Sequence, residues 1–256
     1  MKKSIKILAI GNSFSVDGME YLWQVLRAGG LEEVTLGNLY IPGCPVSLHA
    51  DNIASDAHTY VYYKNTDGTW RAAPEASLAD GLLDEEWDII TLQQASHDSG
   101  LPETYDRQGE VIDYVCAHKR NPDAVMYWHM TWAYQSDSDH WAFPRYNSDQ
   151  ATMYNAIVNA VQTQILSNPA YAGVIPTGIA IQNLRATPVG DTVTRDGFHM
   201  SESHGRYTAA LTWAQTLCGV DPDTVDWMPE AFADAIRPDL AYIREAVKKA
   251  GTTPLV

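Results

Sequence analysis

The stretch Ile5-Lys6-Ile7-Leu8-Ala9-Ile10-Gly11-Asn12-Ser13 decides which fold we expect for this chain. Its first six residues are mostly apolar and partly β-branched, and Gly11 ends the run, which predicts a buried strand. From Val16 onward, apolar residues follow at helical spacing up to the pair Gly29-Gly30, which is typical of a helix end. A buried strand that turns directly into a helix is the first unit of an α/β fold, and Ser13 lies in that turn.

The rest of the sequence repeats this alternation of apolar strands and helices. Further strands are predicted at 34–40, 87–92, 124–128 and 173–176, and helices at 47–54, 77–83, 104–119, 152–166, 205–217 and within the tail 229–249. Two strand-like runs flank Asn65-Thr66-Asp67-Gly68, so we expect a β-hairpin insertion at about 56–75. We therefore predict one α/β domain over 1–256, with three α/β/α layers and a mostly parallel central sheet.

Composition and charge exclude several classes of partner. Acidic residues number 32 against 17 basic ones, and the net charge of −15 disfavours both nucleic acid and an anionic membrane surface. No apolar run approaches the roughly 20 residues that a membrane-spanning helix needs. The three cysteines, Cys44, Cys116 and Cys218, are too far apart for a disulfide framework or a zinc site.

The amino-terminal apolar run is too short for the core of a secretion signal and continues into the predicted turn at Ser13. A cytoplasmic location is therefore the default expectation. A secreted or periplasmic location is the alternative, if a leader has been removed.

Ligand sites in parallel sheets form at the carboxyl ends of the strands. Those ends are followed by residues 11–15, 41–45, 93–99, 129–140 and 177–204. Ser13 stands at the start of a helix, where its own backbone N–H and the helix dipole would stabilise a developing oxyanion. The alternative is that Ser13 is simply a helix N-cap.

Asp196-Gly197-Phe198-His199 is the second feature that indicates chemistry. In a turn of this length the carboxylate can fold back onto the imidazole, fix its tautomer and stabilise its charged form. The alternative is a surface loop in which the two residues meet by chance. His204 is a weaker candidate for the base, because Ser201-Glu202-Ser203 before it resembles a helix start.

Taken together, these segments resemble the sequence blocks of the SGNH (GDSL-like) hydrolases. Gly11-Asn12-Ser13-Phe14-Ser15 is similar to the Gly-Asp-Ser-Leu motif, and Asp196-x-x-His199 to the carboxy-terminal Asp-x-x-His block. Gly43, in Ile41-Pro42-Gly43-Cys44, matches the glycine of the second block. The phrase Leu92-Gln93-Gln94-Ala95-Ser96-His97 resembles an uncharacterised bacterial branch, the DUF4886-type proteins, and is similar to that of sialate and xylan acetylesterases.

The resemblance implies an SGNH/flavodoxin-like fold and a serine esterase without metal or cofactor. Ser13, His199 and Asp196 would be the catalytic residues, and the oxyanion hole would comprise the backbone N–H groups of Ser13 and Gly43 and the Gln94 side chain. The third block departs from the family's Gly-x-Asn-Asp. A glutamine amide carries the same donors as asparagine, so Gln94 is assigned here, with Gln93 and His97 as alternatives.

The aromatic and polar residues near the ends of the predicted strands are candidates for substrate contacts. These candidates are Asn12, His97, Trp128, His129, Trp132 and Tyr134. An aromatic core with an ordinary polar loop is the alternative. The acidic stretch Asp137-Ser138-Asp139-His140 lacks a calcium-loop signature, so no metal is expected.

The expected partner is a small-molecule or glycan ester, and the expected reaction is removal of a small acyl group, such as acetyl, from a carbohydrate. The alternatives are a lipase or thioesterase of the same superfamily and a non-catalytic glycan-binding protein on the same fold.

Overall fold

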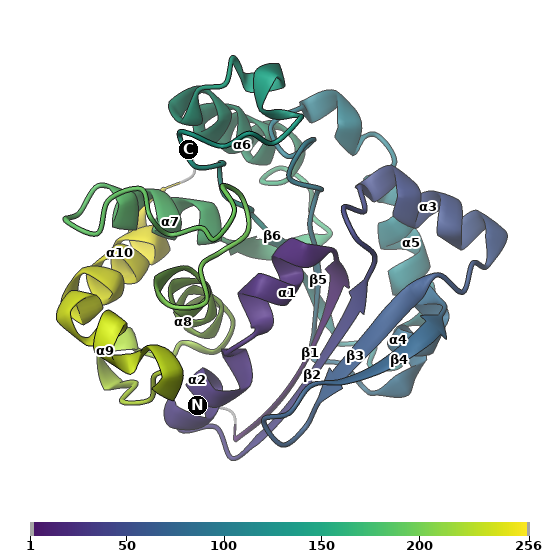
Figure 1. The fold of residues 1–256 in the computed structure, drawn as a ribbon. Coiled ribbons are helices and arrows are strands. Elements are labelled where there is room, and N and C mark those ends of the chain that lie inside the picture. Colours follow the sequence, from purple (N-terminus) through teal and green to yellow (C-terminus); the bar gives the residue numbers. More distant parts are fainter. Residues whose placement is uncertain (1–2, 255–256) are drawn as a thin grey trace.

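The computed structural model describes residues 3–254, and its centre is a seven-stranded sheet with the order β4-β3-β2-β1-β5-β6-β7 (Figure 1). The strands are β1 (Ser4–Gly11), β2 (Glu33–Tyr40), β3 (Tyr60–Asn65), β4 (Arg71–Ala76), β5 (Ile89–Leu92), β6 (Val125–His129) and β7 (Tyr171–Ile175). Neighbouring strands pair in parallel along β2, β1, β5, β6 and β7, and the hairpin β3–β4 adds two antiparallel strands at the edge next to β2. The predicted α/β fold with a mostly parallel sheet is confirmed.

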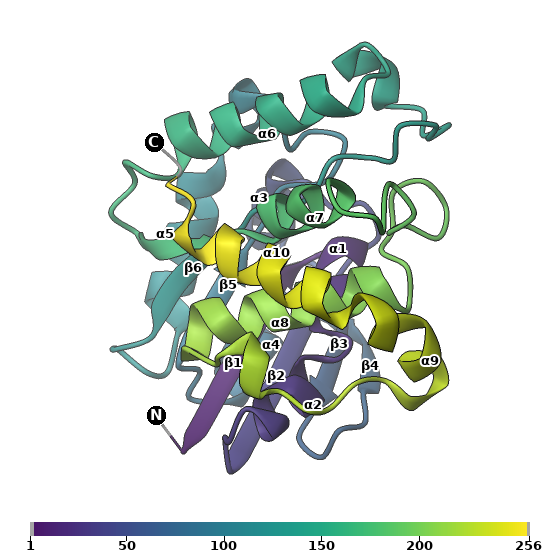
Figure 2. The same cartoon turned by 90° about the vertical axis from the view of Figure 1, so that its left-hand side faces the viewer.

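Helices cover both faces of the sheet (Figures 1 and 2). They are α1 (Ser13–Met19), α2 (Leu22–Ala28), α3 (Val46–Ser55), α4 (Leu78–Asp84), α5 (Gln108–His118), α6 (Gln150–Gln164), α7 (Thr177–Arg185), α8 (His204–Cys218), α9 (Ala233–Ile236) and α10 (Leu240–Thr252). On one face α8 packs against α1, α2, α7 and α10, and on the other α5 packs against α3 and α4. Within residues 3–254, no helix is long and apolar enough to cross a lipid bilayer.

Strand β1 lies at the centre of this arrangement, with β2 on one side and β5 on the other. Ile7, Leu8 and Ile10 are completely buried, and burying each such side chain contributes about 1.5–3 kcal/mol to folding. The turn that follows β1 is therefore anchored by one of the most buried strands of the molecule.

Two helical segments differ from the sequence predictions. The single helix expected over 16–29 is divided into α1 and α2, because the Trp70 indole N–H lies 3.4 Å from the Glu20 carbonyl that a continuous helix would use internally. Helix α7 lies in a segment for which no helix was predicted. Its second residue, Gly178, packs so closely that a Cβ atom there would lie 2.1 Å from the Thr131 carbonyl oxygen, so a weak helix former is required by packing.

Candidate active site

Ser13 is the first residue of α1, at the carboxyl end of β1. The helix is capped by Asn12, whose Oδ1 accepts a hydrogen bond from the Phe14 N–H at 3.0 Å. The Ser13 hydroxyl is therefore not the cap, contrary to the alternative interpretation of this serine. The side chain stays partly exposed, next to the point between β1 and β5 where the strand order reverses and ligands bind in such sheets.

The structure brings Ser13, His199 and Asp196 into one hydrogen-bonded row. His199 Nδ1 lies 2.6 Å from Asp196 Oδ2, and His199 Nε2 lies 2.8 Å from Ser13 Oγ. Because a carboxylate only accepts hydrogen bonds, Nδ1 donates to Asp196, which leaves Nε2 free to accept from the serine hydroxyl. This is the geometry in which an imidazole can take the proton of an attacking hydroxyl.

The charge of Asp196 is stabilised by its own loop. Burial raises its pKa, but hydrogen bonds from the His199 ring and from the backbone N–H groups of His199 and Phe198 outweigh that effect, so the pKa lies below its ordinary value. The carboxylate therefore stays ionised beside the imidazole at neutral pH.

The loop that carries His199 is fixed at several points. The Gln135 backbone N–H donates to the Gly197 carbonyl at 2.7 Å, and the Trp132 indole N–H donates to the Phe198 carbonyl at 2.7 Å. Trp132 also stacks on Phe14 of α1, with ring centroids 4.2 Å apart. The loop is thereby tied both to the segment after β6 and to the helix that begins with Ser13.

Asp17, one turn after Ser13, is a further fixing point that the sequence analysis missed. Its carboxylate is fully buried and accepts hydrogen bonds from the Met200 N–H (2.8 Å), Arg195 (2.9 Å) and Arg206 (2.8 Å). The available signal was a lone acid on the otherwise buried side of a short helix, where a charge requires partners.

Two backbone N–H groups near Ser13 have no acceptor within residues 3–254. One belongs to Ser13 itself and the other to Gly43, in the turn after β2. Gly43 has a φ of +59°, which favours glycine, although a Cβ atom there would meet nothing within 4 Å. Asn12 Nδ2 donates to the Cys44 carbonyl at 3.1 Å, so the turns that carry Ser13 and Gly43 are bonded to each other.

The Gln94 amide is bonded to residues other than Ser13, and its predicted place in the oxyanion hole must be corrected. Its Nε2 donates to the carbonyl and hydroxyl oxygens of Thr104 at 3.0 Å, and its Oε1 accepts from the N–H groups of Val46 and Ala95 at 2.9 Å. These four hydrogen bonds engage both the NH₂ group and the oxygen of the Gln94 amide. Gln94 instead caps the start of α3 and so supports the turn of Gly43.

Gln93 and His129 form a buried row that supports Asn12. His129 Nε2 accepts from the Thr177 hydroxyl (3.1 Å), His129 Nδ1 donates to Gln93 Oε1 (2.9 Å), and Gln93 Nε2 donates to Asn12 Oδ1 (2.8 Å). Burial lowers the pKa of His129 to about 3, so the ring stays neutral and keeps this pattern of donors and acceptors.

Most of the residues predicted to contact substrate are not accessible in this structure. At most 1% of the surface is exposed for Asn12, Trp128, His129, Trp132 and Tyr134. They pack or hydrogen-bond beneath the site, as the alternative of an aromatic core expected. His97 differs, since its side chain is partly exposed and lies 5.3 Å from the ring of Trp141, which is 65% exposed.

Two further sequence expectations concern groups outside the row. His204 begins α8 and its Nε2 lies 3.0 Å from Asp239 Oδ2, so it is engaged elsewhere. Across the described residues, no group of three or more His, Cys, Asp or Glu side chains is arranged to hold a metal ion.

Comparison with known proteins gives both a family and a fold. The family model for a domain of unknown function, DUF4886, matches residues 6–242. A crystal structure of a DUF4886 family protein from Bacteroides uniformis is 35% identical, covers 99% of this chain and 96% of its own, and superposes with a TM-score of 0.92. No curated protein matches this chain.

More distant structures share the fold. A protein from Slackia heliotrinireducens described as an SGNH hydrolase is 18% identical, with a TM-score of 0.54 over 84% of this chain and 99% of its own. The acetyl xylan esterase AlAXEase is 15% identical, with a TM-score of 0.52 over 82% of this chain and 98% of its own. The chain therefore has the fold of the SGNH hydrolases.

Proposed function

The chain belongs to the DUF4886 family, and we propose that it is a serine esterase that removes small acyl groups, acetyl above all, from carbohydrates. The observation that carries this proposal is the row from Asp196 through His199 to Ser13, with spacings of 2.6 and 2.8 Å at the carboxyl edge of the sheet. The likeness of the fold to that of an acetyl xylan esterase supports the choice of a sugar ester.

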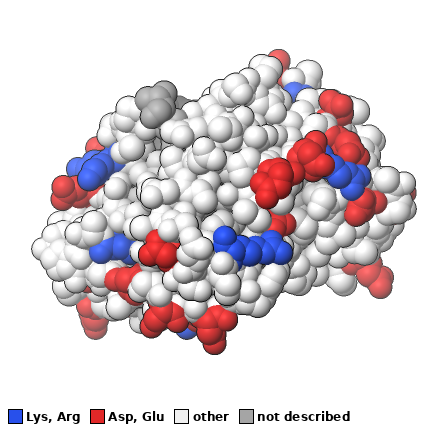
Figure 3. All heavy atoms as spheres, turned by 90° about the horizontal axis from the view of Figure 1, so that it is seen from above, with Lys and Arg blue, Asp and Glu red and all other residues white. Residues whose placement is uncertain are grey.

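The surface at this edge also favours a neutral substrate. Figure 3 views the molecule from the side toward which the parallel strands of Figure 1 point, and acidic and basic side chains are scattered there between large uncharged areas. A substrate that carried many negative charges would meet no broad basic patch on this face.

In the first half of the reaction, Ser13 Oγ attacks the ester carbonyl carbon while His199 Nε2 takes the hydroxyl proton. Asp196 stabilises the imidazolium that forms. As the tetrahedral intermediate collapses, the bond from the carbonyl carbon to the sugar oxygen breaks, and His199 returns the proton to that oxygen. The sugar leaves with a free hydroxyl, and the acyl group stays on Ser13.

In the second half, His199 takes a proton from a water molecule that attacks the acyl-enzyme, and then protonates Ser13 as the acid leaves. In both halves the carbonyl oxygen becomes negative. We assign the free backbone N–H groups of Ser13 and Gly43 as its donors, and each such donor is typically worth about 3 kcal/mol of transition-state stabilisation.

The test is hydrolysis of p-nitrophenyl acetate, p-nitrophenyl butyrate, p-nitrophenyl palmitate and acetylated xylan. The Ser13→Ala and His199→Ala variants should each lose roughly a thousandfold or more in kcat. His204→Ala is the matched control, because it removes a histidine that is also paired with an aspartate but lies outside the row. Equal rates in wild type and Ser13→Ala would refute the proposal, and a preference for the palmitate ester would favour the lipase alternative.

A further inference from the structure

Helix α1 leads from Ser13 to a second feature of the surface. In residues 13–20, partial exposure is confined to Ser13, Val16 and Glu20, and the other five residues are buried. Positions separated by three and seven residues lie on one face of a helix, and seven residues correspond to about 10 Å along its axis. The exposed stripe of α1 therefore runs from the candidate nucleophile to Glu20.

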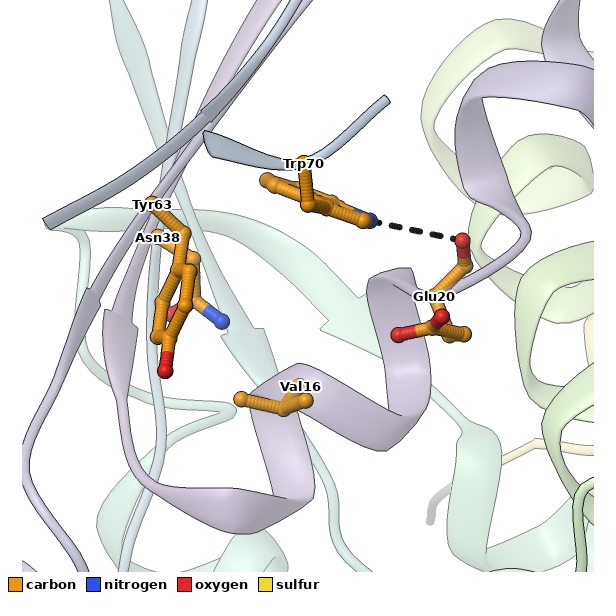
Figure 4. Close-up of a pocket in the computed structure, with 5 residues that line it drawn as sticks. All are labelled: Val16, Glu20, Asn38, Tyr63 and Trp70. Atoms are coloured by element: carbon orange, nitrogen blue, oxygen red, sulfur yellow. Dashed lines mark hydrogen bonds between the residues drawn. The ribbon is translucent and has the colours of Figure 1, made fainter. Parts of the chain in front are cut away.

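A cavity of about 160 Å³ lies along this stripe. It is lined by Val16 and Glu20 of the α1 segment, Asn38 of β2, and Tyr63 and Trp70 of the hairpin (Figure 4). Figure 4 shows these side chains converging on one space, with the two aromatic rings facing Val16 and Glu20. The volume is below the roughly 300–1,000 Å³ of drug-sized sites, so it suits a group the size of a single ring.

The Glu20 carboxylate points into this cavity without a direct partner. Within residues 3–254 no hydrogen bond or ion pair engages its oxygens, and the Arg206 guanidinium nearby is bonded to Asp17 instead. Burial raises the pKa of Glu20 more than Arg206 lowers it. The carboxylate is only partly buried, and a ligand with hydroxyl groups could supply the donors that the described residues do not.

Asn38 supplies a second polar group from the opposite side. Its side chain is 1% exposed, and its Oδ1 lies 2.9 Å from the Ser15 hydroxyl, which also lies 2.7 Å from the Asn12 carbonyl. The Nδ2 atom has no partner among the described residues and is directed into the cavity (Figure 4). The Ser15 hydroxyl has one hydrogen and can donate to only one of these two oxygens. If the Asn38 amide is turned over, Nδ2 donates to Ser15 and Oδ1 faces the cavity, so a polar atom of Asn38 faces the cavity in either orientation.

From these observations we propose that the cavity binds one neutral sugar ring, in the alcohol part of the ester that Ser13 cleaves. The ring faces would pack on Trp70 and Tyr63, and hydroxyl groups would donate to Glu20 and bond with Asn38. Sugar hydroxyls both donate and accept, which matches a carboxylate beside an amide. The unpaired carboxylate disfavours sugars that carry a carboxylate of their own, such as uronates and sialate.

This inference rests on the proposed function, because it assigns the cavity to the substrate of that reaction. Its test measures binding without turnover. Full-length Ser13→Ala protein is titrated by calorimetry with xylotriose, mannotriose and galactobiose, with glucuronic acid as the anionic probe and tetramethylammonium as a cationic one. At least one neutral sugar should bind saturably, and glucuronic acid should bind at least tenfold more weakly.

In the same background, Glu20→Gln and Trp70→Ala should each weaken sugar binding at least tenfold. Glu202→Gln is the matched control, because it removes an exposed carboxylate that lies outside the cavity but still acts on Glu20 electrostatically. Circular dichroism establishes that each variant is folded, and Trp70→Phe, which keeps an aromatic face, should retain most of the binding.

Three results would overturn the inference. They are the absence of saturable sugar binding up to about 10 mM, which is the range of weak ligands, sugar binding by Glu20→Gln equal to that of its parent protein, and saturable binding of tetramethylammonium but of no sugar. If wild type hydrolyses esters but no sugar binds, the cavity assignment fails while the proposed function stands. If sugars bind but wild type and Ser13→Ala hydrolyse esters equally, the proposed function fails instead.

Discussion

Replacing Asp17 by asparagine tests whether α1 fixes the loop that carries His199. The carboxylate accepts three N–H donors, from Met200, Arg195 and Arg206, and is itself fully buried. Asparagine has one acceptor oxygen, so its NH₂ group must face at least one of these donors. The two arginines also lose the negative charge that neutralises them.

The expected loss of stability follows from these contacts. A hydrogen bond to a charged group contributes about 1.5–3 kcal/mol, and removing one partner of a buried ion pair costs about 3–5 kcal/mol. Arg195 keeps 35% of its side chain exposed, so water offsets part of its loss. We therefore expect Asp17→Asn to lower the free energy of unfolding by about 3 kcal/mol, which corresponds to roughly 6–12 °C in Tm for a domain of this size.

The same change should also lower kcat. Met200 directly follows His199, and a displacement of about 1 Å at the reacting groups can cost about a hundredfold in rate. Thermal unfolding followed by circular dichroism gives Tm, and hydrolysis of p-nitrophenyl acetate at about 25 °C gives kcat. Asp234→Asn is the control, since that carboxylate is fully exposed and should change stability by at most about 0.5 kcal/mol. An unchanged Tm and kcat in Asp17→Asn would refute this account of the loop.

Three further predictions concern the surroundings of the site. Gln94→Ala should lower the free energy of unfolding by about 1–3 kcal/mol, measured in urea, because the buried Val46 N–H loses its acceptor; an unchanged midpoint would contradict the capping role. Gly43→Ala should cost roughly 1–2 kcal/mol, because alanine resists the left-handed φ of +59°, and it should reduce kcat on p-nitrophenyl acetate about tenfold or more if the N–H binds the oxyanion; wild-type kcat would exclude Gly43 from that role. The free energy of unfolding should fall as pH drops below 6.5, because burial lowers the pKa of His49 and His129 to about 3 and only the unfolded state then binds protons on these rings. Between pH 7.5 and 5.5 the loss is on the order of 1.4 kcal/mol per histidine. A urea midpoint that stays constant over this range would show that these rings are not held neutral.

The frame of the fold could be predicted because its signals are local. The sequence pattern alone predicts apolar strands that end in glycine and helices with regular apolar spacing, without any information about the segments that pack against them. The break at Glu20 could not be predicted, because it depends on Trp70, fifty residues away. Helix α7 was missed for a similar reason, since Gly178 weakens the helical pattern in order to pack against Thr131.

At the site, the predictions from short motifs agree with the geometry of the structure better than those from aromatic composition do. Ser13, Asp196 and His199 meet as the motifs implied, and their catalytic roles remain predictions. The aromatic residues at the end of β6 and after it were expected to contact a ligand, but Trp128, Trp132 and Tyr134 are buried by packing that the sequence pattern does not reveal. The partners of the Gln93 and Gln94 side chains, which include His129 and Thr104, could not be predicted because no spacing in the sequence reveals these contacts.

Covalent labelling of Ser13 is the measurement that tests the central claim most directly. The protein is incubated with a fluorophosphonate, and the modified peptide is located by mass spectrometry, with His199→Ala and His204→Ala treated in parallel. The account predicts one adduct, on Ser13, that forms readily in wild type and in His204→Ala and is nearly lost in His199→Ala. A protein that stays unlabelled, or a label on another serine, would contradict it.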